Sequence, residues 1–233
     1  MTRRRWIADE VSGDCAALTG SHAQHLARVL RARIGQEFDV VAGGKVRRGR
    51  VISVADERVE FELGEEVLEP GRPHITLALS IFKFDHMEWA IEKCTELGAS
   101  RILPVIARRT DSHLSTAAVK RVERWQRIAL AAAQQSRRSS PPEILLPAKL
   151  QEVLAIQAVC RIVLSESESE VTLSDIAPAG ETALAIGPEG GWTDEELQEF
   201  RKAGWTSASL GNTILRAETA AIAALAVVMA LAP

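Results

Sequence analysis

The chain has 233 residues, of which 46% are hydrophobic and 25% are charged, and its formal net charge is −3. This composition is typical of a soluble globular protein and allows one large domain or two small ones. Its three cysteines are widely spaced and include no C-x-x-C pair, so the sequence predicts neither a disulfide framework nor a zinc site and fits a reducing cytoplasm. The basic start lacks a following apolar stretch, and the uncharged run at residues 219–233 is too short for a membrane span. We therefore expect a cytoplasmic protein with no secretory signal and no membrane partner.

The first part of the chain has the pattern of a small β-unit. Residues 36–63 alternate between apolar and polar side chains and contain a Gly43-Gly44 turn, which predicts antiparallel strands. Residues 65–73 then place a glycine between two prolines, as linkers often do. We expect one domain over residues 1–70 and a second over residues 73–233.

The second part alternates strands with helices. A strand is expected over residues 75–81, then a helix capped by Asp85 and ended by Gly98, then a strand over residues 102–106. A helix follows over about residues 116–136, and further strands are expected near Ile162, Ala183 and Ser207, with helices after Thr193 and at the end. Such βαβ units indicate an α/β fold with a parallel, doubly wound sheet.

Two glycine-bearing segments, residues 184–197 and 209–220, each join an apolar run to a helix. In the first, a buried strand leads into a tight turn at residues 188–191, and Thr193 caps the next helix with Glu196 in a capping box. Loops after the carboxyl ends of strands are where open α/β sheets bind ligands. The glycine spacing fits neither a triphosphate loop nor a dinucleotide fingerprint. A tight turn before a well-capped helix, without a ligand, explains this first segment equally well.

Charge is distributed unevenly along the chain. Residues 1–50 contain ten Lys and Arg against five Asp and Glu, residues 101–138 contain nine against two, and residues 165–200 contain ten acidic residues and no Lys or Arg. This asymmetry favours a basic face for a phosphate backbone and an acidic face turned away from it. Chance clustering on a solvated surface is the alternative.

The segments GPEGG (187–191) and LGNTILRAETA (210–220) together resemble the signature of the RsmE family, bacterial 16S rRNA uridine-N3 methyltransferases of the SPOUT class. Residues 25–31, Lys83 with residues 91–98, and residues 133–138 with 142–144 agree with it in the same order. Departures are Gln134, Trp192 and Ala217, none at a position expected to act in chemistry. The resemblance implies a PUA-like β-barrel followed by a SPOUT α/β domain with a C-terminal trefoil knot.

The resemblance also implies a function. It implies S-adenosylmethionine as cofactor, N3 of a uridine in the decoding region of 16S rRNA as methyl acceptor, the small ribosomal subunit as context, and a homodimer. The cofactor contacts implied by the resemblance are Leu164, Ile186, Gly187, Pro188, Gly190, Gly191, Leu210, Gly211, Ile214 and Leu215. Alternatives are a SPOUT enzyme acting on a ribose 2′-hydroxyl or a tRNA base, and an inactive PUA-type RNA-binding protein.

Three polar residues beside these apolar loops are candidates for catalysis. Arg216 is suited to stabilise the anion that forms when uridine N3 loses its proton, and Glu218 or Glu189 to accept that proton or orient the base. Each has a structural alternative. Glu189 could favour a helix N-terminus, and Arg216 could form an ion pair with Glu218.

Several cations are candidates for contacts with RNA phosphates. Arg28 and Arg31 have the spacing of one helix face, Lys83 and Arg109 each follow a strand, and Arg137 with Arg138 follows a long helix whose C-terminal dipole they could instead complement. The whole set is Arg3, Arg4, Arg5, Arg28, Arg31, Lys83, Arg109, Arg137 and Arg138. His22 and His25 lack a third ligand nearby, so no metal is expected.

Overall fold

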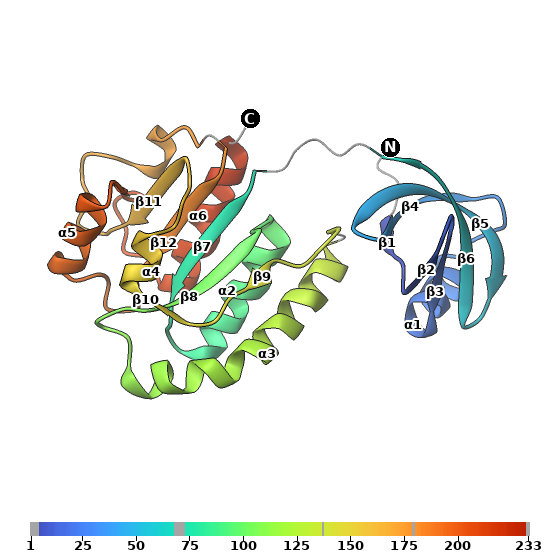
Figure 1. Ribbon diagram of the computed structural model, residues 1–233, viewed down its shortest axis with the longest axis horizontal. Helices are drawn as coiled ribbons and strands as arrows, with labels where there is room; N and C mark the ends of the chain where they lie inside the picture. Colours follow the sequence, from blue (N-terminus) through green and yellow to red (C-terminus); the bar gives the residue numbers. More distant parts are fainter. Residues whose placement is uncertain (1–4, 68–72, 137, 179, 232–233) are drawn as a thin grey trace. The chain divides into compact units, whose positions relative to one another are not determined.

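The computed structural model describes residues 5–67, 73–136, 138–178 and 180–231 (Figure 1). The chain divides into two compact units, one formed by Met1–Arg72 with Ser136–Ser140 and the other by Pro73–Gln135 with Pro141–Pro233. Across the described residues, no helix is long and apolar enough to cross a membrane.

The first unit is built on a six-stranded sheet in the order β1-β4-β5-β6-β3-β2. Its strands are β1 (Arg5–Ile7), β2 (Glu10–Ser12), β3 (Cys15–Thr19), β4 (Glu37–Ala42), β5 (Lys45–Ala55) and β6 (Arg58–Glu66). β1 and β2 lie at opposite ends of this order, although only Ala8 and Asp9 separate them in sequence. Ala8 N–H donates to the Val41 carbonyl at one end and Asp9 N–H to the Ala17 carbonyl at the other. The sheet therefore curls on itself as a small barrel.

The expected antiparallel unit corresponds to β4, β5 and β6, and its turn lies at Gly43 and Gly44. The sequence did not predict β1 and β2, because each has only three residues and neither is buried on one face. Two short helices, α1 (Gly20–Gln24) and the π-helix η1 (His25–Val29), pack onto the barrel through Ala23 and Leu26. The chain leaves helical conformation before Arg31, whose φ is 51°. The expectation that Arg28 and Arg31 share a helix face was therefore wrong.

The second unit contains an entirely parallel sheet in the order β10-β8-β7-β12-β11-β13, with β9 added beside β8. Its strands are β7 (Ile75–Ser80), β8 (Arg101–Ile106), β9 (Glu143–Ile144), β10 (Ala148–Lys149), β11 (Cys160–Leu164), β12 (Thr182–Ile186) and β13 (Thr206–Ala208). The strands predicted near Ile162, Ala183 and Ser207 correspond to β11, β12 and β13.

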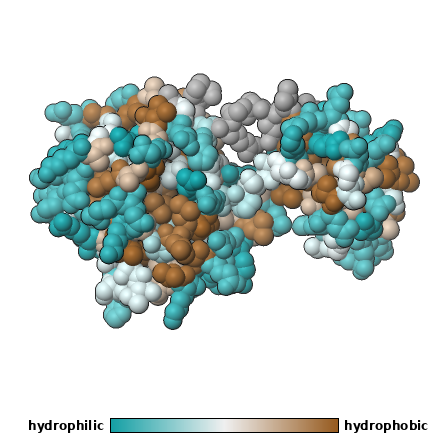
Figure 2. All heavy atoms as spheres, viewed as in Figure 1, coloured by the Kyte–Doolittle hydropathy of each residue, from teal (hydrophilic) through white to brown (hydrophobic). Residues whose placement is uncertain are grey.

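Helices cover both faces of this sheet (Figure 1). They are α2 (Phe84–Leu97), α3 (Ser112–Gln135), α4 (Leu150–Leu154), the 3₁₀ helix η2 (Leu173–Asp175), α5 (Asp194–Lys202) and α6 (Ala217–Leu231). Leu77 and Leu79 of β7 pack with α2, α3 and α6, whereas Ala78 faces the side covered by α4 and α5. Because successive strand residues point to opposite faces, this division confirms the doubly wound arrangement. Apolar residues also reach the visible surface of this unit, among hydrophilic ones (Figure 2).

The helix boundaries differ from expectation at two places. Lys83, not Asp85, is the N-cap of α2, and Asp85 lies in the first turn, where its negative charge still favours the helix dipole. Helix α3 begins at Ser112, four residues before the expected start at Thr116. Gly98 does end α2, with a φ of 120°.

Candidate functional site

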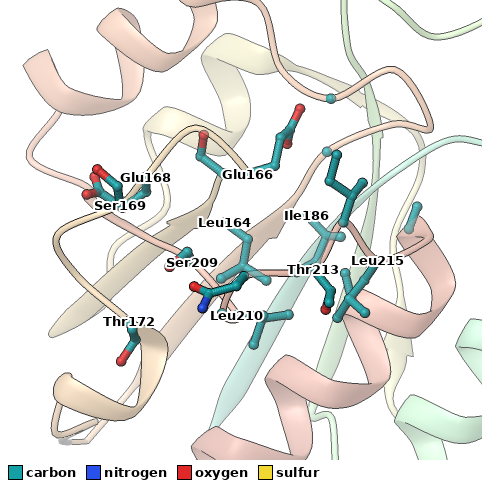
Figure 3. A pocket seen from close by; sticks show the side chains of 18 of the residues that line it. Leu164, Glu166, Glu168, Ser169, Thr172, Ile186, Ser209, Leu210, Thr213 and Leu215 are labelled. Atoms are coloured by element: carbon teal, nitrogen blue, oxygen red, sulfur yellow. The ribbon is translucent and has the colours of Figure 1, made fainter.

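The site lies where β12, β11 and β13 end side by side. Because the three strands are parallel neighbours, the loops that follow them meet at one edge of the sheet. Together these loops and the start of α6 enclose a pocket of about 410 Å³, a volume typical of small-molecule sites (Figure 3).

Most of the residues expected to contact a cofactor line this pocket. The sequence-predicted residues in its wall are Leu164, Ile186, Gly187, Pro188, Glu189, Gly191, Leu210, Gly211, Ile214 and Leu215. Gly190 is expected there but is not in the wall, and Arg216 and Glu218 are not either. The two glycine segments are thus brought together.

The wall also contains residues that sequence reasoning missed. They are Ser165, Glu166, Glu168, Ser169, Thr172, Ser209, Asn212, Thr213, Ala217 and Ala220. Five of them belong to the loop after β11, which has no glycine and no known ligand motif. Only the order of the strands could have indicated this loop, because it follows β11, which lies between β12 and β13 in the sheet.

The wall is apolar in its middle and acidic at one end. Leu164, Ile186 and Leu215 supply apolar surface, with Thr213 beside them, whereas Glu168 and Ser169 lie together at one end (Figure 3). Hydrogen bonds from the backbone N–H of Glu170 and Val171 lower the pKa of Glu168, which keeps it ionised at neutral pH. Part of the acidic segment at residues 165–200 therefore faces a cavity, where a cationic ligand would find negative charge.

The loop after β12 is a tight turn. Gly191 N–H donates to the Pro188 carbonyl at 2.8 Å, and Gly191 has a φ of 69°. A Cβ added at Gly191 would collide with the Glu166 carboxylate, and one at Gly187 would lie 3.2 Å from the Trp192 indole nitrogen. A side chain at Gly187 would therefore press on Trp192 instead of filling the ligand space.

The loop ends in the predicted capping box. Glu196 N–H donates to the Thr193 hydroxyl at 3.2 Å, and Thr193 N–H donates to the Glu196 carboxylate at 2.9 Å. Arg109, a candidate for RNA contact, is exposed and donates to backbone carbonyls of this loop. Its position after β8 was predicted, but its partner was not.

The loop after β13 is more open. Residues 211–214 are exposed, and the Ile214 side chain is 87% exposed although it lines the pocket. Arg216 is exposed between two lining residues, Leu215 and Ala217. Within the described part of the chain it has no ion-pair partner, so the expected alternative of a pair with Glu218 is wrong.

Glu218 is placed differently from expectation. It lies in the first turn of α6, its side chain is only 3% exposed, and it is not in the pocket wall. Its Oε1 is 2.7 Å from Nδ1 of His86 in the first turn of α2. This contact spans 132 positions of sequence and ties the start of α6 to α2.

The remaining candidates for RNA contact belong to several elements of both units. Arg3, Arg4 and Arg137 lie outside the described residues, Arg5 is in β1, Lys83 is exposed at the start of α2, and Arg138 follows α3. Arg31 is exposed. The Arg28 guanidinium donates to Asp56 at 2.6 Å, and this bond raises the pKa of Arg28 further.

The two histidines considered as metal ligands have other neighbours. His22 Nδ1 lies 2.9 Å from Asp9, and the His25 ring lies 5.8 Å from that of Trp6. The described residues contain no group of three side chains arranged to hold a metal.

Known proteins resemble this chain over its whole length. The model of the RNA methyltransferase domain matches residues 69–229, and that of the RNA methyltransferase PUA domain matches residues 18–64. Ribosomal RNA small subunit methyltransferase E of Synechocystis sp. is 36% identical, over 92% of this chain and 72% of the relative. The protein of that name from Aquifex aeolicus is 30% identical, over 96% of this chain and 98% of the relative.

A solved structure agrees with these relatives. The ribosomal RNA small subunit methyltransferase E of Neisseria gonorrhoeae, bound to S-adenosyl methionine, superimposes with a TM-score of 0.78 at 32% identity, over 99% of this chain and 98% of that one. The expected fold class, a SPOUT methyltransferase domain after a PUA-like domain, is confirmed, while the knot itself stays a prediction. The chain belongs to the ribosomal RNA small subunit methyltransferase E family.

Proposed function

We propose that this protein transfers the methyl group of S-adenosylmethionine to N3 of a uridine in the decoding region of 16S rRNA, acting in the cytoplasm on the small ribosomal subunit. One observation carries the proposal. The pocket at the ends of β11, β12 and β13 is formed by the family's two signature segments, in a chain similar over its full length to an enzyme solved with S-adenosyl methionine.

The residues of the pocket suit this cofactor. Leu164, Ile186 and Leu210 offer apolar surface to an adenine, and Gly187 and Gly211 bring backbone close to the ligand. Carboxylates of Glu166, Glu168 and Glu189 suit the positive charge of a sulfonium and an ammonium group. We propose the ten expected contacts as cofactor residues except Gly190, which is not in the wall.

When bound, S-adenosylmethionine would supply an electrophilic methyl group. The protein must then hold the uracil in line with it and stabilise the charge left on N3 when the proton departs. Arg216 is suited to the second task, because it is an exposed cation between two residues of the pocket wall. Glu189, exposed in that wall, is the proposed proton acceptor. Glu189 would accept the N3 proton, and N3 would then take the methyl group that the cofactor supplies as that group leaves the sulfur.

Glu218 is better suited to positioning than to proton transfer. Its carboxylate is buried and bonded to His86, so it cannot meet a base in the pocket without breaking that contact. Burying a carboxyl group is costly unless it is hydrogen-bonded or paired. We therefore assign Glu218 to holding the start of α6, which in turn carries Arg216.

RNA and a second copy of the chain are the proposed partners. Arg31 and Lys83 are exposed cations suited to phosphate contacts. Helix α6 has no charged residue after Glu218, and its apolar residues Ile222, Ala226 and Val227 are only half-buried. An uncharged helix face of this kind favours a homodimer interface.

Nucleoside analysis tests the proposal. Small ribosomal subunits, free 16S rRNA and tRNA are each incubated with the protein and S-adenosylmethionine carrying a labelled methyl group, then digested to nucleosides. We expect label in 3-methyluridine from 16S rRNA. Label in a 2′-O-methylated nucleoside or in tRNA would support a different SPOUT specificity, and absence of label despite RNA binding would support an inactive RNA-binding protein.

A further inference from the structure

We infer that Arg109 is a positioning residue for the pocket, which holds the loop at residues 187–193 in its ligand-binding shape instead of contacting RNA. The inference rests on the proposed function, in which S-adenosylmethionine occupies the pocket. Arg109 is not in the pocket wall, so its effect has to pass through the loop.

The Arg109 side chain lies along this loop. Its Nη1 donates to the Gly190 carbonyl at 2.5 Å, and a longer contact of 3.4 Å reaches the Trp192 carbonyl. A Cβ added at Gly190 would lie 3.3 Å from the Arg109 Cδ, so the aliphatic stem also runs close to the loop backbone. Hydrogen bonds from a charged donor are stronger than neutral ones. The guanidinium therefore braces the side of the turn that faces away from the ligand.

Glu196 holds the end of the same loop, at Thr193. It is fully buried, and its two carboxylate oxygens accept from different segments: Oε2 from Thr193 N–H at 2.9 Å, and Oε1 from Arg108 N–H at 2.8 Å. A capping box alone would use only the first bond. The second bond ties the start of α5 to the segment after β8, which places Arg109 beside the loop.

This bracing matters at the exposed tip of the loop, because the far end is already anchored by the buried Trp192. Pro188, Glu189 and Gly191 line the pocket, and the turn bond from Gly191 N–H to the Pro188 carbonyl is internal to the loop. A bond within the turn preserves its shape but does not hold it against the rest of the domain. Without Arg109, binding would have to order the loop first, which lowers affinity.

Arg108 provides a matched control. It is the adjacent residue and has the same charge, but among the described residues its side chain forms ion pairs only with Glu195 and Glu199 of α5, at 3.9 and 3.7 Å. Arg109→Gln and Arg108→Gln therefore remove equal charge from the same surface. If Arg109 contacts RNA phosphates, both variants should lose similar amounts of RNA affinity. If Arg109 braces the loop, only Arg109→Gln should lose cofactor affinity.

The experiment measures three quantities for the full-length wild type and each variant: affinity for S-adenosylmethionine by calorimetry, RNA affinity at several salt concentrations, and single-turnover methylation at saturating cofactor. We expect Arg109→Gln to weaken cofactor binding about tenfold, with Arg108→Gln within about twofold of wild type. RNA affinity and the rate at saturating cofactor should change equally little in both. Arg109→Lys, which can still reach one carbonyl, should be intermediate and serves if the glutamine variant misfolds.

Two outcomes would overturn the inference while leaving the proposed function intact. One is unchanged cofactor affinity in Arg109→Gln and Arg109→Lys when the wild type binds. The other is an equal loss of RNA affinity and a lower salt slope in both glutamine variants, which would make Arg109 a phosphate contact. A wild-type protein that does not bind S-adenosylmethionine would instead overturn the proposed function, and this inference with it.

Discussion

The two glycine-bearing loops of the pocket are anchored in different ways. The loop at residues 187–193 is braced from outside by Arg109 and Glu196 and closed by its own turn bond. The loop at residues 210–216 is exposed over most of its length, and a Cβ added at Gly211 would meet nothing within 4 Å. Within the described part of the chain, residues 211–215 form no hydrogen bond with another residue.

Because the two loops are anchored differently, we expect them to have different roles in binding. A braced loop can present a fixed wall to a cofactor, because little entropy is lost when the ligand binds. An open loop leaves its polar groups free for a ligand or a substrate, and we expect it to become ordered only when the site is filled. The main anchor of the open loop is then the start of α6, held by Glu218 and His86.

The largest expected effect comes from removing that anchor. His86→Ala leaves the buried Glu218 carboxylate without its partner, and breaking a buried pair in this way costs about 3–5 kcal/mol. Because His86 is partly exposed, we expect a loss of unfolding free energy near the lower end, about 3 kcal/mol. Denaturant unfolding measures it. His113→Ala, at an exposed position in α3, is the control, and equal stability of the two variants would show that the contact does not anchor α6.

The second-largest effect concerns Arg216 in the open loop. It distinguishes a role in methyl transfer from a role in cofactor binding. Arg216→Ala removes the cation proposed to face the charge that develops on N3, and loss of one such stabilising group typically slows a reaction about 100-fold. Cofactor affinity should be near that of the wild type, because Arg216 is not in the pocket wall. Single-turnover rates at saturating RNA and cofactor measure the effect. A normal rate would remove Arg216 from the catalytic residues.

The braced loop was more predictable from sequence than its surroundings. Strand β12 and the capping box of Thr193 with Glu196 depend on residues that are adjacent in the chain, and both were predicted. The partners of Arg109 and Glu218 lie 81 and 132 positions away, where local patterns contain no information. The loop after β11 was missed for a related reason, since its residues become a pocket wall only through the strand order.

A substitution in the braced loop tests how rigid its shape must be. Gly191→Ala meets a φ of 69°, which costs an L-residue about 1–2 kcal/mol, and its Cβ displaces Glu166 from the pocket edge. We expect about tenfold weaker binding of S-adenosylmethionine by calorimetry. Gly211→Ala also has an unfavourable φ, of 108°, but meets no neighbour, so its loss should be smaller, about threefold. Equal losses from the two variants would contradict the difference between the loops.

The smallest effect concerns Glu168 in the loop after β11, at the acidic end of the pocket that the two glycine-bearing loops also line. Glu168 lies in the pocket wall, and the backbone N–H groups of Glu170 and Val171 lower its pKa. A lowered pKa keeps the carboxylate charged as the solution is acidified, and the charge is lost only when the pH falls through that lowered value. Glu168→Gln should therefore weaken cofactor binding by about threefold, as expected for a half-buried charge at the pocket edge. The ratio between variant and wild type should stay constant from about pH 8 to about pH 5.5. If the ratio shrank toward one within this range, Glu168 would be titrating there, and the backbone hydrogen bonds would not be holding its charge.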